Sequence, residues 1–412
     1  MLKKQDNNMI NTLEKIHYIS DANITAPIGF HADGQHVGLK HKSKDLGWIF
    51  SEVPAAVAGV FTTNQVQAAP VQLNKQTIKN GQLQAIIVNS GNANAVTGKI
   101  GLTHAKIMQA TAAEQLNIPP HLVGVASTGI IGQILPINKV VNGIQQLHVD
   151  GDAHGFAHAI MTTDTSEKAI TIQSEIDGNL ITMSGVAKGS GMIHPNMATM
   201  LGFITTDANI SSTMLQQALS EDIDTSFNQI TIDGDTSTND MVLVLANGLA
   251  SNTQIKAASA AYNQFKTMLH TVTTALAIAI ANDGEGATKL ITVTVSHANN
   301  ALDARLIAKK VVGSSLVKTA MFGKDPNWGR IIAAIGAADV QIDPDIIDIT
   351  INHFFVMKNG APVTFDTAAM ANSLSQKNID IEINLHQGAA SGQAWGSDLT
   401  YDYVKINALY TT

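Results

Sequence analysis

A glycine-rich segment, residues 185–201, brings one lysine and one threonine into a setting where they could do chemistry together. Lys188 is followed by Gly-Ser-Gly, and a Pro-Asn turn then leads to Ala198 and Thr199. A threonine hydroxyl can attack the carbonyl carbon of the residue before it, and hydrolysis of the resulting ester frees an α-amine with a pKa of about 7.7–8.0. That amine can serve the same hydroxyl as a general base. Thr199 is therefore a candidate for an N-terminal nucleophile made by self-cleavage, and an ordinary hydrogen-bonded hydroxyl is the alternative.

Other routes to covalent or metal chemistry are not visible in the sequence. The chain contains no cysteine, so a nucleophile must use oxygen or nitrogen. The phosphate-binding, zinc-protease and dinucleotide-binding motifs are absent. The acidic segment 233–240 lacks the glycine and the glutamate that a calcium loop of the EF-hand type requires. We interpret it as a turn held by hydrogen bonds of its own Asp, Ser and Thr side chains, and we predict no metal site.

Composition limits the classes of protein to which the chain can belong. Its 412 residues correspond to two or three domains. Lys and Arg total 25 and Asp and Glu total 33, and the resulting net charge of −8 argues against nucleic acid or an anionic membrane as a partner. The longest apolar run, residues 275–281, is far shorter than the ~20 residues that span a bilayer. Because residues 1–20 show no signal-peptide pattern, we expect a soluble, cytoplasmic protein.

Short elements in the first two thirds of the chain are expected to position these residues. Aliphatic and β-branched residues predict strands at 85–88, 123–126, 169–176 and 180–186, the last two joined as a hairpin through Asp177-Gly178-Asn179. Start and stop signals predict helices at 103–116, 211–220 and 270–281. The polar stretch 89–94 follows the first of these strands, and Ser127-Thr128-Gly129 follows the second. Each of these two strands should therefore end in a polar loop.

The last third of the chain has a different pattern. It predicts β-type segments at 291–296, 346–357, 379–385 and 400–406, helices at 302–310 and 330–335, and a hairpin turn at Asn359-Gly360. A loop of Asp283-Gly-Glu285-Gly precedes this region. We therefore predict a catalytic core over residues 1–285 and a C-terminal domain over 286–412, whose tail returns to the active site. Because helices and strands mix without strict alternation, we predict an α+β fold.

The chain resembles the ornithine acetyltransferases, the bifunctional glutamate N-acetyltransferases and amino-acid acetyltransferases of arginine biosynthesis. The segment Lys188-Gly-Ser-Gly-Met-Ile-x-Pro-Asn-Met-Ala-Thr199-Met-Leu is similar to the self-cleavage signature of that family. Further similar segments follow in the family's order at residues 25–30, 59–64, 88–95, 233–240, 318–320, 325–330 and 406–408. The resemblance runs from about residue 24 to the end of the chain. Glu167 and Leu409 depart from the family's usual pattern.

The resemblance implies roles for particular residues. It implies cleavage between Ala198 and Thr199, after which Thr199 carries the acetyl group. It implies an oxyanion hole at Thr128 and Gly129, where a hydroxyl and a backbone N–H could both donate. The remaining residues that it implies are substrate contacts, at Thr165, Lys188, Glu285, Asn407 and Thr412.

Elementary chemistry gives two of these contacts a specific meaning. An ammonium at Lys188 could pair with a substrate carboxylate, and the carboxylate of Glu285 could hold a cationic side-chain amine. Without the resemblance, a turn-capping hydroxyl would be the favoured interpretation of Thr128, and Lys188 and Glu285 could be solvated charges.

The resemblance implies a ping-pong acetyltransferase. N-acetyl-L-ornithine would give its acetyl group to Thr199, and L-glutamate would then take it to form N-acetyl-L-glutamate. The family implies no metal and no organic cofactor, and whether acetyl-CoA also serves as a donor is left open. The family also implies an α-β-β-α sandwich and a heterotetramer of two chains 1–198 and two chains 199–412. A self-processing aminopeptidase or amidase of similar fold, and an amino-acid-binding protein without catalysis, are the alternatives.

Overall fold

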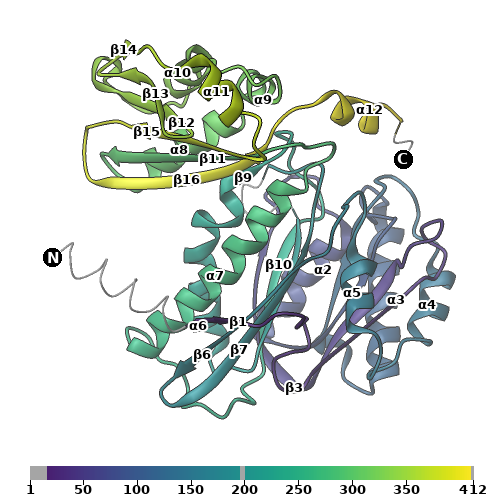
Figure 1. Ribbon diagram of the computed structural model, residues 1–412. Helices are drawn as coiled ribbons and strands as arrows, with labels where there is room; N and C mark the ends of the chain where they lie inside the picture. The colour runs from purple at the N-terminus through teal and green to yellow at the C-terminus, as the bar shows by residue number, and fades with distance from the viewer. Residues whose placement is uncertain (1–15, 195–199, 410–412) are drawn as a thin grey trace.

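The structure, a computed structural model, describes residues 16–194 and 200–409. The described part contains two β-sheets with helices packed against them (Figure 1). This mixture of helices and strands agrees with the predicted α+β class. Ala198, Thr199 and Thr412 lie outside the described residues, so what the sequence predicts for them stays a prediction.

The larger sheet holds the strands that lead to the candidate site. Its nine strands within the described residues are β1 (His17–Tyr18), β2 (Phe30–Gln35), β3 (Leu46–Phe61), β4 (Gln82–Asn89), β5 (Val123–Ser127), β6 (Lys168–Ile176), β7 (Asn179–Lys188), β8 (Leu201–Thr206) and β10 (Met241–Ala246). Their order in space is β1-β6-β7-β8-β10-β3-β4-β5, and β2 pairs with the first part of β3. The four strands predicted in this region are confirmed as β4, β5, β6 and β7.

Two strands that follow the candidate cleavage point lie between strands that precede it. β7 pairs antiparallel with β8, and Lys188 stands opposite Leu201 at one end of this ladder. β8 pairs in parallel with β10, which pairs antiparallel with β3 on its other edge. The chain therefore leaves β7 and enters β8 at the same end of the sheet, next to the start of β10.

Helices pack on this sheet from two sides. The helices of the described chain are α2 (Ala69–Thr77), α3 (Gly98–Leu116), α4 (Ile137–Ile144), α5 (Ala153–Ile160), α6 (Ser212–Asp222), α7 (Ala260–Asn282), α8 (Ala301–Val312), α9 (Ser315–Phe322), α10 (Trp328–Gly336), α11 (Thr367–Ser373) and α12 (Tyr401–Leu409). One core cluster joins α6 and α7 to β6, β7 and β8, and another joins α3 and α4 to β4 and β5. A third cluster, with residues of β3, β4, β8 and β10, completes the core of this part of the chain.

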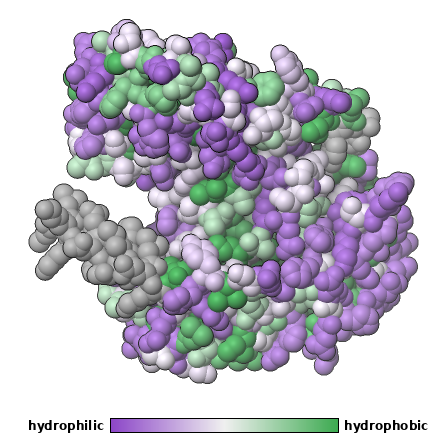
Figure 2. All heavy atoms as spheres, in the orientation of Figure 1, coloured by the Kyte–Doolittle hydropathy of each residue, from purple (hydrophilic) through white to green (hydrophobic). Residues whose placement is uncertain are grey.

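Helix α7 lies directly on β7. A Cβ atom at Gly185 would come within 2.7 Å of the Val272 side chain and 2.8 Å of the Leu276 side chain. Glycine at this position lets the long helix approach the strand that ends at Lys188. Figure 2 shows hydrophobic residues gathered in the middle of the visible face, over part of α7, with hydrophilic residues over most of the rest. None of the described helices combines the length and the apolar character needed to cross a membrane.

The smaller sheet takes most of its strands from the last third of the chain. Its seven strands within the described residues are β9 (Ile230–Thr231), β11 (Leu290–Ala298), β12 (Asp348–Ile351), β13 (Phe354–Lys358), β14 (Ala361–Pro362), β15 (Asn378–Asn384) and β16 (Ala390–Ser397). Their order is β14-β13-β12-β15-β11-β16-β9. Because β9 comes from before residue 285 and pairs with β16, this sheet crosses the predicted domain boundary.

Several predicted elements differ from the structure. The β-type prediction for 400–406 is wrong, because α12 occupies this region and the Thr400 hydroxyl accepts the N–H of Tyr403 in its first turn at 3.2 Å. The segment 346–357 is not one strand, since positive φ angles at Asn352 and His353 turn the chain between β12 and β13. Helices α3 and α7 begin earlier than predicted. The hairpin turn at Asn359-Gly360 is confirmed, with φ of 46° and 71°.

Candidate functional site

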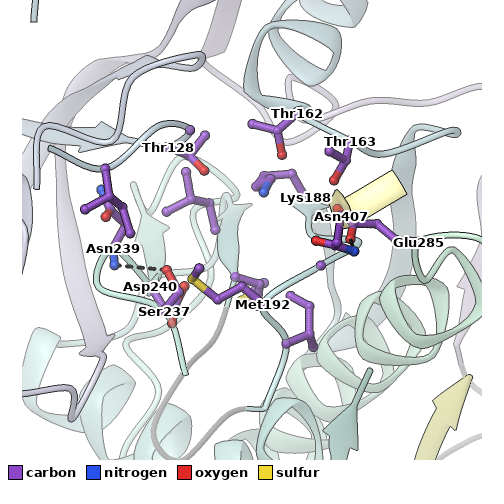
Figure 3. A pocket seen from close by; sticks show the side chains of 16 residues that line it. Thr128, Thr162, Thr163, Lys188, Met192, Ser237, Asn239, Asp240, Glu285 and Asn407 are labelled. Atoms are coloured by element: carbon purple, nitrogen blue, oxygen red, sulfur yellow. Dashed lines mark hydrogen bonds between the residues drawn. The ribbon is translucent and has the colours of Figure 1, made fainter. Parts of the chain in front are cut away.

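A cavity of about 400 Å³ lies where the ends of several strands of the larger sheet meet (Figure 3). We call it the main cavity. Five residues predicted from the sequence line it together, and they come from four segments far apart in the chain, namely Thr128 with Gly129, Lys188, Glu285 and Asn407. Met200, the residue that directly follows Thr199, also lines it. The structure therefore gathers most of the predicted site at one place.

Thr128 and Gly129 form the turn that leaves β5. Gly129 has a φ of 128°, and a Cβ atom there would lie 2.5 Å from the backbone of Gly91, so only glycine fits this turn. The Thr128 N–H donates to the carbonyl of Asn89 at 3.0 Å. Its hydroxyl makes no hydrogen bond to any residue in the described ranges and lines the main cavity. This hydroxyl is therefore able to donate to a negatively charged oxygen in the cavity.

The polar loops around this turn hold it in place. The Asn89 side chain accepts from the Ser127 hydroxyl at 2.6 Å, and its amide donates to the carbonyl of Asn92 at 2.9 Å. From the segment 233–240, the Asn239 amide donates to the carbonyls of Ala93 and Ser127 at 2.5 and 2.8 Å. The polar stretch after β4 thus supports the shape of the candidate oxyanion hole.

Lys188 is the last residue of β7 and is largely buried at the cavity wall. Among the described residues, no carboxylate oxygen lies within 4 Å of its ammonium nitrogen. Asp164 lies near enough for the charges to interact. Burial acts to raise the pKa of Asp164, but the charges of Lys188 and Lys168, together with hydrogen bonds from Lys168 and Thr162, lower it to about 2. The Lys188 side chain therefore lies at the cavity wall without a carboxylate partner in contact among the described residues.

A buried ionic network fixes the loops on either side of Lys188. The Lys168 ammonium donates to Asp164 at 2.7 Å and to Asp283 at 2.6 Å, and the Gly189 N–H donates to Asp164 at 2.6 Å. The side chain of Lys168 is 1% exposed, that of Asp164 0% and that of Asp283 8%. The network joins the loop after α5, the end of β7 and the loop after α7.

Thr165 belongs to this network and not to the cavity wall. Its hydroxyl and its N–H both donate to the Asp283 carboxylate. The residues of this loop that line the main cavity are Thr162 and Thr163. The sequence motif located the correct loop, but the structure does not bring the Thr165 side chain into the cavity.

Glu285 and Asn407 meet on the side of the cavity away from Thr128 (Figure 3). The Asn407 amide donates to Glu285 at 2.7 Å, and the Glu285 N–H donates to the carbonyl of Ser190 at 2.9 Å. A Cβ atom at Gly191 would come within 2.5 Å of the Glu285 carboxyl group, so glycine makes room for this carboxylate. Asn407 of α12 therefore lies beside Glu285 at the cavity wall.

Helix α12 is attached near the cavity at further points. The Thr400 hydroxyl donates to the carbonyl of Gly286 at 2.7 Å. Burial raises the pKa of the Tyr403 hydroxyl, and the carboxylates of Asp233 and Glu285 raise it further. The carboxylates of Asp233 and Glu285 therefore both lie near Tyr403 on this side of the cavity.

Sequence reasoning missed the role of the segment 233–240. It does form the expected turn, since the Asp233 carboxylate accepts the N–H of Asp235 at 3.2 Å. The same carboxylate also accepts the N–H groups of Met192 and Ile193 at 2.6 and 2.9 Å, and so anchors the glycine-rich segment. Ser237, Asn239 and Asp240 line the main cavity. The family-like pattern of this segment was the signal that could have identified it.

Asp240 is a buried carboxyl group at the cavity wall. Its Oδ2 atom has no hydrogen-bond partner among the described residues. Burial raises its pKa well above the ordinary value for aspartate, against weaker opposing effects of Ser237 and of the Lys188 charge. The described residues contain no group of three or more His, Asp or Glu side chains that could hold a metal ion.

Comparison with known proteins gives a consistent result. The model of the ArgJ family matches residues 31–412. The arginine biosynthesis bifunctional protein ArgJ of Staphylococcus epidermidis is 57% identical over 395 residues, which cover 96% of this chain and 100% of that protein. The protein of the same name from Streptococcus thermophilus is 55% identical with the same coverage.

A solved structure agrees with these relatives. The crystal structure of the arginine biosynthesis bifunctional protein ArgJ from Bacillus halodurans is 48% identical, with a TM-score of 0.50. The match covers 50% of this chain and 98% of that one. Taken with the family model and the relatives that match along nearly the whole length, this means that the chain belongs to the ArgJ family.

Proposed function

We propose that this chain is an acetyltransferase of arginine biosynthesis that moves the acetyl group of N-acetyl-L-ornithine to L-glutamate through an ester on Thr199. The observation that carries the proposal is the main cavity, where Thr128, Gly129, Lys188 and Glu285 lie together next to Met200, the residue bonded to Thr199. An uncleaved binding protein would not need a free hydroxyl donor at that place. Family membership supports the same activity, since the curated relatives are named for arginine biosynthesis.

The nucleophile would be made by self-cleavage. The Thr199 hydroxyl attacks the carbonyl carbon of Ala198, the peptide C–N bond breaks, and the nitrogen becomes the α-amine of Thr199. Water then hydrolyses the ester and leaves chains 1–198 and 199–412. The solved ArgJ chain from Bacillus halodurans supports this step, because it spans about half of the present chain.

Acetyl transfer would then proceed in two half-reactions. The Thr199 hydroxyl attacks the acetyl carbonyl of N-acetylornithine, and ornithine leaves when the amide C–N bond breaks and its nitrogen takes a proton. The α-amine of glutamate next attacks the ester and releases the Thr199 hydroxyl. The α-amine of Thr199 would carry the proton in each step. Thr128 and Gly129 would stabilise the oxyanion that forms in both half-reactions.

Charges around the cavity suit amino-acid substrates. Lys188 would pair with the α-carboxylate that both substrates carry, and Glu285, held by Asn407, would bind the side-chain ammonium of ornithine. Thr162 and Thr163 line the cavity, so Thr165 would act by shaping their loop. Thr412 would contribute from the end of the tail that α12 brings to this region.

The remaining features of the proposal concern fold and assembly. Three core clusters, two of them with helices on opposite sides of the strands, support an α-β-β-α sandwich. The smaller sheet, with β9 added, supports a C-terminal domain beginning near residue 286. We propose a cytoplasmic heterotetramer of two cleaved pairs that needs no metal or organic cofactor.

The proposal is tested by following the acyl-enzyme directly. Incubation with N-acetylornithine without glutamate should add the mass of one acetyl group to chain 199–412, and peptide mapping should place it on Thr199. Thr128→Ala should slow this single-turnover acetylation by about 10²–10³, because one oxyanion donor is lost, with little change in the N-acetylornithine concentration needed for half-saturation. An acetyl group found on lysine or histidine would contradict the proposal. Hydrolysis of N-acetylornithine would also contradict it, if added glutamate does not receive the acetyl group in place of water.

Replacement of Glu285 should affect the two half-reactions differently. Glu285→Gln removes a charge-assisted contact worth about 1.5–3 kcal/mol, so acetylation by N-acetylornithine should lose about ten- to a hundredfold in kcat/KM. Deacetylation by glutamate should change less, because the lost carboxylate repels the glutamate side chain. Stopped single-turnover assays measure each half separately. Glu221→Gln, which changes a half-exposed carboxylate on α6, is the matched control and should alter neither half. Equal losses in both halves would show that Glu285 supports the loop instead of selecting the donor.

A further inference from the structure

The wall of the main cavity contains a carboxyl group that the proposed reaction does not use. Asp240 lines this cavity directly before β10, and only 3% of its surface is exposed. Its Oδ2 atom accepts no hydrogen bond from the described residues. An acceptor that is buried without a partner destabilises a folded protein, so such a group calls for an explanation from function. The free oxygen of Asp240 therefore points to a hydrogen-bond donor that belongs to the working state of the site.

The chain around Asp240 is held on both sides. The Asp240 carbonyl accepts the N–H of Thr62 at 3.0 Å, and the N–H of Met241 donates to the carbonyl of Met200 at 3.0 Å. Hydrogen bonds from the side chain and the backbone of Ser237 reach the Asp240 carboxyl group. Turning the Oδ2 atom out to solvent would break these bonds to Ser237, so the free oxygen is held in the cavity wall.

The start of β8 is the neighbouring segment from which a donor can come. Met241 pairs with Leu201 in the parallel ladder of β10 and β8. Asp240 and Met200 precede this pair, and both line the main cavity. Thr199 is bonded to Met200, and consecutive Cα atoms are about 3.8 Å apart, so Thr199 is one peptide unit from this point. In the intact chain its nitrogen belongs to a peptide bond, but the proposed cut would turn it into an α-amine with two or three N–H groups.

The charges that line the main cavity suit an amine next to Asp240. Lys188, Glu285 and Asp240 are the titratable side chains of the described residues that line it. Glu285 lies on the far side, where Asn407 donates to it (Figure 3). Burial raises the pKa of Asp240 well above its usual range, while hydrogen bonds from Ser237 and the charge of Lys188 lower it less strongly. An ammonium next to Asp240 would favour the ionised carboxylate, because a nearby opposite charge stabilises the charged form.

We propose that Asp240 is a positioning residue for the nucleophile, and that its Oδ2 atom accepts a hydrogen bond from the α-amine of Thr199 after the cut. The inference rests on the proposed function, because this amine exists only in the cleaved chain. In acetylation the hydroxyl proton of Thr199 would pass to the amine while its oxygen bonds to the acetyl carbon. The resulting ammonium would give a proton to the nitrogen of ornithine as the amide C–N bond breaks. Asp240 would neither gain nor lose a proton, but it would orient the amine and stabilise its ammonium form.

The pKa of this α-amine tests the inference without relying on turnover. Labelling of the cleaved protein with fluorodinitrobenzene over a range of pH, followed by peptide mapping, gives the pKa of the Thr199 amine and, in the same molecules, that of the Met1 amine. Asp240→Asn keeps the size of the side chain but removes its charge, so the pKa of the Thr199 amine should fall by about one unit or more. The pKa of the Met1 amine should not change.

The pH dependence of acetylation should follow the amine. In Asp240→Asn, the pH profile of single-turnover acetylation by N-acetylornithine should move to lower pH by the same amount as the pKa of the Thr199 amine. The limiting rate should fall by about tenfold or more, because the amine is no longer oriented toward the hydroxyl. A carboxyl group that only supports the fold would not move this profile.

Asp207→Asn is the matched control. Asp207 is also a buried aspartate, but it follows β8 at the end of the strand away from Met200 and does not line the main cavity. Its replacement should lower stability, because its carboxylate accepts the N–H groups of Ile28 and Thr182. It should leave the pKa of the Thr199 amine unchanged.

A crystal structure of the cleaved wild-type protein gives a second readout, which decides the question even if Asp240→Asn stays uncleaved. The Thr199 nitrogen should lie at hydrogen-bond distance, about 2.7–3.2 Å, from the Asp240 Oδ2 atom. A water molecule in place of that nitrogen, or equal amine pKa values in wild type and Asp240→Asn, would overturn the inference and leave the proposed function standing. An active wild-type chain that stays intact would instead refute the proposed nucleophile, and this inference with it.

Discussion

Thr199→Ala is expected to yield a single chain of full length that forms no acetyl-enzyme and transfers no acetyl group. The variant removes the oxygen that must both break the bond after Ala198 and carry the acetyl group, so neither step has a substitute. Wild-type protein should instead separate under denaturing conditions into chains 1–198 and 199–412, the second beginning Thr-Met-Leu-Gly. Denaturing gels, N-terminal sequencing and intact mass give the answer directly.

Thr199→Ser serves as the control for this experiment. Serine keeps a hydroxyl at the same position, so cleavage and acetylation should both occur, at altered rates. Cleavage in Thr199→Ala, or full activity from a wild-type chain that stays intact, would contradict the assignment of the nucleophile.

Lys168→Met should lower the free energy of unfolding by about 3–5 kcal/mol. The change leaves two buried carboxylates, Asp164 and Asp283, without the ammonium that lies 2.7 and 2.6 Å from them, and an uncompensated buried charge is strongly destabilising. Urea unfolding is best measured in the intact Thr199→Ala background, where a single chain unfolds. Lys266→Met is the matched control, because its ion pair with Glu221 is exposed and should contribute at most about 1 kcal/mol.

The ionic network of Asp164, Lys168 and Asp283 should also affect how the free energy of unfolding depends on acid pH. The pKa of Asp164 falls from 3.8 to about 2 in the folded protein, so its ionised form is favoured by folding. This contribution is fully present above about pH 4 and is lost as the pH falls toward 2. In Lys168→Met the pKa of Asp164 should be less depressed, so this acid-dependent contribution to stability should be smaller. If Lys168→Met lowers the free energy of unfolding by less than about 1 kcal/mol at neutral pH, the ionic network relaxes or admits water.

Local patterns in the sequence predicted much of the fold. The strand that ends at Lys188 and its hairpin with β6 follow from aliphatic and β-branched residues on both sides of a single turn, and the start of α6 follows from Ser211, whose hydroxyl accepts the N–H of Met214. The end of the chain could not be predicted in this way. Tyr401 to Ile406 has strand-like residues, but Thr400 caps the segment as a helix and tertiary contacts bind it to Gly286.

The candidate site, too, could be predicted only in part. Resemblance located Thr128, Lys188 and Glu285, and the structure brings them to one cavity. The ion pair between Lys168 and Asp283 joins residues 115 positions apart, and no periodicity or spacing predicts such a pair. The resemblance predicts Thr165 as a substrate contact, whereas in the structure its hydroxyl donates to Asp283.

The order of strands in the larger sheet has a consequence for how a cleaved and unfolded molecule could refold. β8 and β10 follow the proposed cut but lie between β7 and β3, which precede it, and hydrogen-bonded ladders hold them on both edges. A cleaved molecule would stay together without a peptide bond at this point, and diluting it would not separate its parts. Once unfolded, however, its two parts could return to one sheet only by a bimolecular encounter, with a rate that depends on their concentration. An intact chain would fold with a rate that does not depend on concentration, so folding before the proposed cut would avoid this encounter.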